Sequence, residues 1–483
     1  MPVALLATRE IHKFKQRGQY ILFDVESCSV SEIDRLTYDV LNLFEKPAPS
    51  SRINALQCTY DALQLEHRLN SLLNEGVLVP FESRPPKKSP EYRKINSPEY
   101  NPIVRLSLNI SERCNMQCGY CYARGGTYYG GASRMTEGVA DKAVDFLIDE
   151  SNDEKRCSII FFGGEPLLGF DLLKHVVCYA RKEAAKVGKT ITFSILTNGT
   201  LIDEEIAAFF DENGVAVNVS IDGPKEIHDL ARCFANGEGS YEVLIPKIEL
   251  LRNTQKIPVN AKPTITHQDP DAWRVYSYLL SLGFTSMKME PVSSQDANFS
   301  MAPEDIGTFN QHLTSIAYDL LERWLEGQAI NFITFTEPIA KLYAGNKNFY
   351  RCDAGLSFLA VSARGDLYPC YAFPGMTDFK LGNVLDGLDK DKRKDFQKYT
   401  HVDSRKPCCT CWARYICGWE CYYHSAKFTK GIESVSGNVC EYYKRVAELS
   451  LFLYLNLKNE DILFASYFYQ PLRSYLSKVL CVK

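Results

Sequence analysis

The sequence lacks the features that would assign it to a membrane or to nucleic acid. None of its apolar runs reaches the ~18 continuous residues that a membrane-spanning helix needs. The formal net charge of -4 gives no general attraction for a polyanion, and positive charge is concentrated only in a short stretch from Arg84 to Lys94. We therefore expect neither a membrane anchor nor a nucleic-acid partner.

The chain also lacks internal repeats, and its first residues, Met1 to Glu10, show neither the basic segment nor the apolar core of a secretion signal. Cysteine, in contrast, is abundant, with 17 in 483 residues. We expect a reducing, cytoplasmic compartment, where clustered cysteines indicate metal binding or catalysis before disulfides. With 45% hydrophobic and 24% charged residues, the composition is that of a globular protein long enough for several domains.

Three cysteines follow an apolar segment at C-x3-C-x2-C spacing, namely Cys114, Cys118 and Cys121. Three close thiolates can hold three irons of a [4Fe-4S] cluster and leave the fourth iron with an open coordination position. Such an iron can bind S-adenosylmethionine and pass an electron to its sulfonium, which releases a 5'-deoxyadenosyl radical. A structural zinc site is the alternative interpretation, but zinc usually takes a fourth protein ligand.

This motif, with an aromatic residue directly before its third cysteine, resembles that of the radical S-adenosylmethionine (radical SAM) superfamily. The resemblance implies a catalytic cluster on the three cysteines. A second motif, Gly163 to Pro166, resembles the superfamily's methionine-binding segment, in which a carboxylate accepts from the methionine ammonium. Small polar residues at two strand ends suit hydrogen bonds to the cofactor, and an arginine suits its carboxylate, although turn residues and a surface salt bridge are the alternatives. The candidate cofactor-binding residues are Tyr120, Gly163, Gly164, Glu165, Pro166, Asn198, Ser220 and Arg232.

Six apolar runs separated by helical segments predict the central fold. The runs are residues 103–110, 158–162, 190–196, 215–221, 259–265 and 286–292. Six such units predict a parallel sheet in an α/β protein, with functional groups at the C-terminal ends of the strands. The radical SAM resemblance implies that this sheet is a partial (β/α)6, TIM-like barrel.

The first 84 residues have a different pattern, with a hairpin about Arg17-Gly18, helical segments at 31–44 and 60–74, and a strand at 77–81. This pattern resembles the winged-helix peptide-recognition domain of maturases that act on ribosomal peptides, which adds a leader peptide to a sheet edge. A generic accessory domain is the alternative. The expected division is a recognition domain at 1–84, a linker at 85–102, the barrel at 103–305, a bridging helical region at 306–350, a cysteine-rich domain at 351–445 and a helical segment at 446–483.

A second set of cysteines lies near the C-terminus, where Gly365 stands between Cys352 and Cys370 in a predicted hairpin turn. The set resembles the seven-cysteine SPASM extension of radical SAM enzymes, which implies two auxiliary [4Fe-4S] clusters. The implied ligands are Cys408, Cys411, Cys417 and Cys440 for one cluster, and Cys352, Cys370 and Cys421 for the other. A zinc ribbon of Cys408, Cys411, Cys417 and Cys421 is the alternative, but it leaves three of the seven cysteines unexplained.

The second auxiliary set is one ligand short of four. Cys409, another side chain or water is one explanation, and a thiolate of the substrate is the other. The other cysteines lack cluster spacing, so we expect free thiols at Cys28, Cys58, Cys157, Cys178, Cys233 and Cys481.

The resemblance is strongest over residues 13–43 and in the three-ligand set, where it is to thioether-forming peptide maturases of the SCIFF or ranthipeptide type. It implies a ribosomal precursor peptide with a leader as substrate, S-adenosylmethionine and three clusters as cofactors, and a flavodoxin- or ferredoxin-type electron donor. Alternatives are thioethers to aspartate or glutamate, carbon–carbon cyclophanes, formylglycine formation in sulfatases, and a scaffold without catalysis. Asp222 is either a general base or a structural residue.

Overall fold

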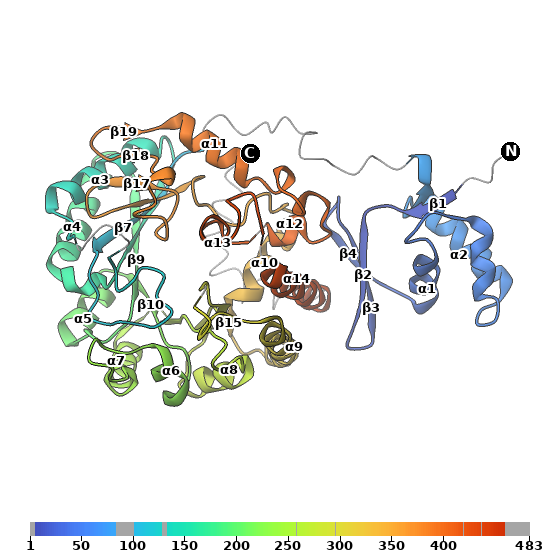
Figure 1. The fold of residues 1–483 in the computed structure, drawn as a ribbon, viewed down its shortest axis with the longest axis horizontal. Helices are drawn as coiled ribbons and strands as arrows, with labels where there is room; N and C mark the ends of the chain where they lie inside the picture. The colour runs from blue at the N-terminus through green and yellow to red at the C-terminus, as the bar shows by residue number, and fades with distance from the viewer. Residues whose placement is uncertain are drawn as a thin grey trace.

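The computed structural model describes residues 5–83, 101–127, 133–256, 258–294, 296–418, 420–435 and 437–458. The predicted linker lies outside these ranges except for residues 101 and 102, as do residues 459–483 of the expected C-terminal segment. Figure 1 shows a small N-terminal part beside a larger body that contains the central sheet. Within the described ranges no helix is long and apolar enough to cross a membrane.

The N-terminal part consists of two small sheets and two helices. Its elements are β1 (Leu5–Thr8), β2 (Ile11–Gln16), β3 (Gln19–Asp24), β4 (Ser29–Ile33), α1 (Arg35–Leu43), β5 (Ala48–Pro49), η1 (Ser50–Leu56), α2 (Ala62–Asn74), β6 (Leu78–Pro80) and η2 (Phe81–Ser83). The predicted hairpin is confirmed, because β2 and β3 pair antiparallel and Gln16 lies opposite Gln19. Arg17 and Gly18 both have positive φ, as a two-residue turn between twisted strands requires.

The predicted helix at 31–44 begins too early. Residues Ser29 to Ile33 form strand β4, which pairs antiparallel with β3. The helix begins only after Asp34, whose carboxylate caps it by accepting a hydrogen bond from the Thr37 amide. Pairing with an existing sheet therefore outweighs the local helical signal.

The central sheet contains strands from all six apolar runs predicted for the barrel. Its parallel strands are β7 (Arg105–Ser111), β8 (Arg156–Gly163), β9 (Thr190–Thr197), β10 (Val215–Val219), β11 (Asn260–Ala261), β13 (Ser286–Met287) and β15 (Asn331–Phe332). The fifth and sixth predicted strands are each split, since β12 (Thr264–Ile265) and β14 (Glu290–Pro291) form a separate parallel pair. Pro263 interrupts the fifth strand because it has no amide hydrogen to donate. The predicted α/β fold class is confirmed.

The cysteine-rich region adds strands to the other edge of this sheet. These are β16 (Phe358–Val361), parallel to β7, and the antiparallel strands β17 (Asp366–Tyr368), β18 (Gly382–Asn383) and β19 (Gly387–Leu388). The turn between β16 and β17 contains Gly365 at a φ of 86°, so the hairpin predicted there is confirmed. β15, by contrast, lies where only helix was expected.

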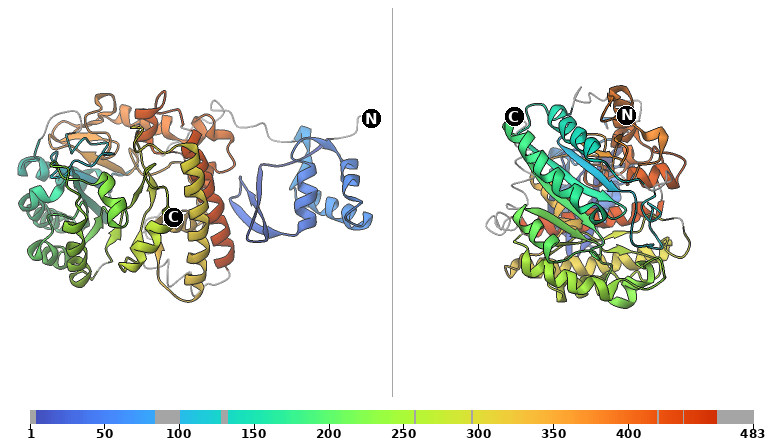
Figure 2. Two further views of the ribbon diagram at one scale, coloured as in Figure 1. Left: turned by 60° about the horizontal axis from the view of Figure 1, so that its bottom comes forward. Right: turned by 90° about the vertical axis from the view of Figure 1, so that its left-hand side faces the viewer.

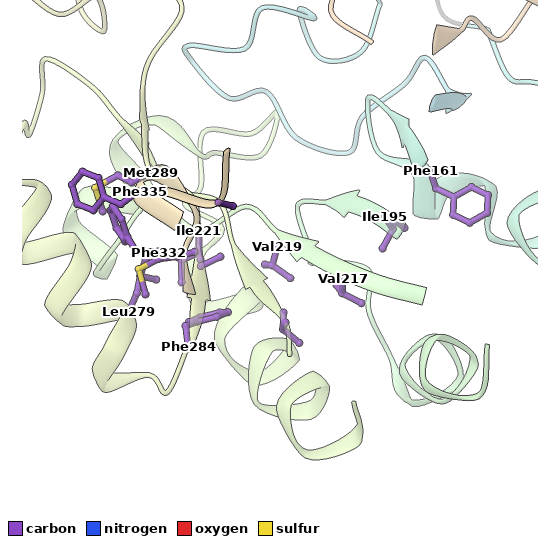
Figure 3. Packing of buried hydrophobic residues seen from close by; sticks show 14 of the residues in the cluster. Phe161, Ile195, Val217, Val219, Ile221, Leu279, Phe284, Met289, Phe332 and Phe335 are labelled. Atoms are coloured by element: carbon purple, nitrogen blue, oxygen red, sulfur yellow. The ribbon is translucent and has the colours of Figure 1, made fainter. Parts of the chain in front are cut away.

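Helices cover the sheet. They are α3 (Glu137–Glu150), α4 (Phe170–Lys186), α5 (Glu204–Glu212), α6 (Lys225–Ala231), α7 (Tyr241–Thr254), α8 (Ala272–Ser281), α9 (Pro303–Leu325), α10 (Ile333–Tyr343), α11 (Lys390–Thr400), α12 (Arg414–Cys417), α13 (Tyr422–Phe428) and α14 (Gly437–Leu457), with short 3-10 turns η3 (Pro166–Gly169), η4 (Thr377–Phe379), η5 (Val402–Ser404) and η6 (Cys408–Thr410). Figure 2 shows α9 and α14 packed side by side. Alternate strand residues such as Ile195, Val217 and Val219 are buried in the core (Figure 3), and each contributes about 1.5–3 kcal/mol on burial.

The N-terminal part is attached to the cysteine-rich region by buried charge. Arg414, whose side chain is 1% exposed, pairs with Glu10 and Glu26 of the N-terminal part. The His12 ring stacks on Trp412 with 3.6 Å between centroids, and its Nε2 lies 3.0 Å from the Glu448 carboxylate. The N-terminal part therefore contacts the segment that carries Cys408, Cys411 and Cys417.

Candidate functional site

The first cysteine loop begins where β7 ends and is held against the end of β8. The amide of Gly164 donates to the Ser111 carbonyl at 2.7 Å, and the amide of Glu165 donates to the Arg113 carbonyl at 2.8 Å. A Cβ on Gly163 would lie 2.2 Å from the Ser111 carbonyl oxygen, and one on Gly164 would lie 2.3 Å from that of Arg113. The two glycines are therefore required for this backbone packing.

The loop brings its three thiols within electrostatic reach of one another. The pKa of Cys114 is raised to about 12 and that of Cys118 to about 11, mainly by burial, and the nearby Cys121 contributes to both shifts. Thiolates this close and this buried need a cationic partner, so the donor set fits an iron cluster. Among the described residues no three His, Cys, Asp or Glu side chains converge as they would around a single metal ion.

Glu165 is a fully buried carboxyl group at the ends of β8 and β9. It accepts hydrogen bonds from the Thr197 hydroxyl at 2.7 Å, the Asn198 amide at 2.8 Å and the Leu167 amide at 3.0 Å. Burial raises the pKa of Glu165 to about 7, although these three donors act in the opposite direction. A bound ammonium group would favour the ionised form, so the position fits the role inferred for the carboxylate.

Two of the small polar candidates lie at the ends of neighbouring strands. The Asn198 side chain donates to Asn115 Oδ1 at 2.9 Å and lies 3.7 Å from the Cys114 sulfur. Ser220 follows β10, and its amide donates to the Thr197 carbonyl at 3.0 Å. Asn198 is thereby joined to the cysteine loop, whereas Ser220 is placed by backbone contacts. Pro166 begins the η3 turn that follows Glu165.

Arg232 forms a buried ion pair with Asp222, rather than the surface salt bridge considered as its alternative role. Its Nε donates to Asp222 Oδ2 at 2.8 Å, and the two side chains are 9% and 3% exposed. The Tyr120 hydroxyl donates to the same oxygen at 2.6 Å, and the Thr264 amide donates to Asp222 Oδ1 at 2.9 Å. Despite burial, Asp222 raises the pKa of Arg232 above its ordinary value.

Besides its hydrogen bond to Asp222, the Arg232 guanidinium lies over the Tyr120 ring, with its Cζ 5.3 Å from the ring centroid. Asp222 joins the cysteine loop, β10 and β12 in one network, which favours the structural interpretation of this residue. The sequence singled out Asp222 by its position at the end of a strand, but the spacing of residues did not identify its hydrogen-bond partners.

The C-terminal cysteines gather in two groups. Burial raises the pKa of Cys408, with further contributions from Cys417, Cys411 and Cys440, and these four thiols line one small cavity. Burial likewise raises the pKa of Cys370, with contributions from Cys421 and Cys352. Cys421 thus groups with Cys352 and Cys370, which argues against the zinc ribbon.

Cys409 is separate from the three-thiol group. After burial, the charged groups that most affect the pKa of Cys409 are Asp403 and Arg414, rather than Cys352, Cys370 or Cys421. Its amide donates to the Arg405 carbonyl at 2.9 Å within the η6 turn. This placement does not favour Cys409 as the fourth ligand that the sequence left open.

With this geometry in place, comparison with known proteins identifies the class. Residues 108–267 match the Radical SAM superfamily, and this match together with the fold supports a radical SAM enzyme. The chain is related to the anaerobic sulfatase-maturating enzymes. The cysteine-type enzyme of Clostridium novyi is 27% identical over 304 residues, which cover 58% of this chain and 76% of the relative.

Solved structures show the same fold. Native anSMEcpe with bound AdoMet has a TM-score of 0.64 at 25% identity and covers 74% of this chain and 99% of its own. SuiB from Streptococcus suis bound to S-adenosylmethionine has a TM-score of 0.52 at 15% identity and covers 90% of this chain and 99% of its own. Both proteins have also been solved with a peptide, Cp18Cys for anSMEcpe and the precursor peptide SuiA for SuiB.

Proposed function

We propose that this enzyme installs a thioether in a ribosomally synthesised precursor peptide, joining a cysteine sulfur to a carbon of another residue. The observation that carries the proposal is the group of Cys352, Cys370 and Cys421, which gathers three thiols and leaves Cys409 elsewhere. An auxiliary cluster on these three thiols would have one iron free for a thiolate of the substrate.

The chain's own residues have distinct tasks in this proposal. Cys114, Cys118 and Cys121 hold the catalytic cluster, while Glu165 accepts from the methionine ammonium and Arg232 donates to the methionine carboxylate. When bound, S-adenosylmethionine and the clusters would supply the hydrogen-atom acceptor and the site for the remaining electron, so that the peptide loses a carbon-bound hydrogen and a thiol proton as the carbon–sulfur bond forms. A flavodoxin- or ferredoxin-type donor would provide the reducing electron.

The structure of the N-terminal part favours a peptide as the substrate. It presents a three-stranded sheet, β2-β3-β4, of the kind to which an extended leader can add a strand. It also contacts the cysteine-rich segment through the buried Arg414. We propose that residues 1–84 bind the leader. Because their removal would leave Arg414 unpaired, point variants at the sheet edge test this role better than deletion.

Formylglycine formation is the second candidate, favoured by the sequence similarity to sulfatase-maturating enzymes. Co-expression with the small open reading frame next to the gene, followed by tandem mass spectrometry, separates the two. A thioether removes two hydrogen atoms from the peptide and makes one cysteine resistant to alkylation. Formylglycine instead introduces an aldehyde that reacts with a hydrazide probe. An aldehyde on the product, or a modified peptide with every cysteine still alkylated, would refute thioether formation.

Thiolate capture predicts a change at one auxiliary cluster. Adding the precursor peptide should alter the electron paramagnetic resonance signal assigned to the Cys352 group, because a new thiolate changes the charge on the irons. The signal of the Cys408 group should stay the same. A peptide with its cysteines changed to alanine should have no effect, and an enzyme with Cys409→Ala should respond as the wild type does. If the Cys409→Ala enzyme shows an altered signal before peptide is added, Cys409 is the fourth ligand.

A further inference from the structure

Charged side chains gather around a cavity between the barrel and the cysteine-rich region. Lys288 and Glu290 come from the split sixth strand, Glu337 and Lys341 from α10, and Arg351 from the loop that leads to Cys352. Helix α14 closes the far side with Tyr442 and Tyr443. This group, which we call the charged cavity, adjoins the auxiliary cysteines, since Arg351 lies within electrostatic reach of Cys417.

A second lysine, Lys262, lies next to Lys288, which lines this cavity. Met289, in the gap between β13 and β14, is buried next to Phe335 (Figure 3), whereas its neighbours Lys288 and Glu290 line the cavity. On the neighbouring strand Ala261 pairs with Met287, and its carbonyl accepts from the Lys288 amide at 3.0 Å. Lys262, the next residue, therefore lies beside Lys288.

The carboxylates of the cavity are already shared among other cations. Lys288 Nζ lies 3.4 Å from a Glu290 oxygen and 3.5 Å from a Glu337 oxygen. Glu337 also pairs with Lys341 at 3.6 Å, and Glu290 pairs with Arg351 at 3.6 Å. Three cationic side chains therefore share the two carboxylates of Glu290 and Glu337. One of the three, Arg351, also lies within electrostatic reach of Cys417.

Among the described residues Lys262 forms no direct ion pair, although Glu290 and Glu337 lie within electrostatic reach of it. No carboxylate in the described part of the chain lies within ion-pair distance of its ammonium group. Burial, together with the charge of Lys288, lowers the pKa of Lys262 to about 8. Like charges on neighbouring strands destabilise the protein, so two adjacent lysines at the functional end of a barrel strand indicate a site for an anion.

We propose that Lys262 and Lys288 bind a carboxylate of the peptide substrate at the edge of the charged cavity. The inference rests on the proposed function for its assumption that the substrate is a peptide. The cofactor's carboxylate is assigned elsewhere, to Arg232 beside Asp222. The charged groups that influence Lys262 are Lys288, Glu290 and Glu337, which lie toward the cysteine-rich region. The carboxylate comes either from an acidic side chain of the peptide or from its C-terminus, because both carry the same anionic group.

Small probes test the site without knowledge of the natural peptide. Equilibrium dialysis would measure binding of N-acetyl-L-glutamate N-methylamide to the reconstituted enzyme with S-adenosylmethionine. The neutral isostere N-acetyl-L-glutamine N-methylamide serves as the control. We expect the acid to bind at least about tenfold more tightly, equivalent to about 1.4 kcal/mol. N-acetyl-L-alanine, which has only a terminal carboxylate, distinguishes a chain terminus from an acidic side chain by which probe binds more tightly.

Variants then locate the site. Lys262→Met should weaken binding of the glutamate probe about tenfold or more, whereas Lys262→Arg should retain it. Lys256→Met is the matched control, because Lys256 is exposed and pairs with Asp211 on the outer surface. Wild-type enzyme that binds acid and amide equally would overturn the inference, as would a Lys262→Met enzyme that loses affinity for S-adenosylmethionine but not for the probe.

The failure of this inference is distinguishable from failure of the proposed function. Equal binding of the two probes leaves the mass-spectrometric assay for a thioether unaffected. Conversely, an aldehyde product would refute the thioether while the preference for the acidic probe and its loss in Lys262→Met could both persist. The two experiments therefore report on separate properties of the enzyme.

Discussion

An enzyme with Cys114→Ala, Cys118→Ala and Cys121→Ala is expected to lose reductive cleavage of S-adenosylmethionine while keeping iron at its C-terminal cysteines. The reason is spatial, because these three thiols gather at the end of β7 and the other two groups form within the cysteine-rich region. Removing one donor set leaves the other two unchanged. Release of 5'-deoxyadenosine under strong reductant measures the loss, and iron analysis measures what is retained.

The matched control for the triple variant is Cys58→Ala. Cys58→Ala changes an exposed thiol in the N-terminal part that belongs to none of the groups, and this enzyme should cleave S-adenosylmethionine as the wild type does. If the triple variant still forms 5'-deoxyadenosine at the wild-type rate, the catalytic cluster lies elsewhere. If it loses all its iron, the three groups do not assemble independently.

Features that depend on local spacing were predictable from the sequence. The C-x3-C-x2-C loop, the Gly163 to Pro166 motif and six strand signals follow from neighbouring residues, and the structure places the motifs at the ends of the strands they follow. The two glycines were visible in the motif, but the sequence did not show why glycine is required at these positions. Only the structure shows that Gly163 and Gly164 pack against the carbonyl groups of Ser111 and Arg113.

Features that depend on tertiary pairing were missed. Strand β4 was predicted as helix because its short segment gains order only by pairing with β3. Strand β15 has two residues and forms only against β13. The charged cavity joins Lys288, Glu337 and Arg351 from distant parts of the chain, and no spacing rule connects such residues.

Asp222 is the clearest case of a site residue whose role needed the structure, and its loss should have a large effect. Asp222→Asn removes the charge that balances the buried Arg232 and weakens the acceptor of the Tyr120 hydroxyl. Breaking a buried ion pair by removing one partner costs about 3–5 kcal/mol. Because the same network positions the cysteine loop, we expect a lower unfolding temperature and weaker binding of S-adenosylmethionine.

Thermal unfolding followed by circular dichroism, together with equilibrium dialysis of S-adenosylmethionine, would measure both effects. Asp211→Asn is the control, since Asp211 pairs with the exposed Lys256 on the surface, where solvent screens the charges. Asp222→Asn with wild-type stability and affinity would show that the Asp222–Arg232 pair does not position the loop. Lower affinity at unchanged stability would instead point to direct contact between Asp222 and the cofactor, because a purely structural role must reduce the stability of the fold that it supports.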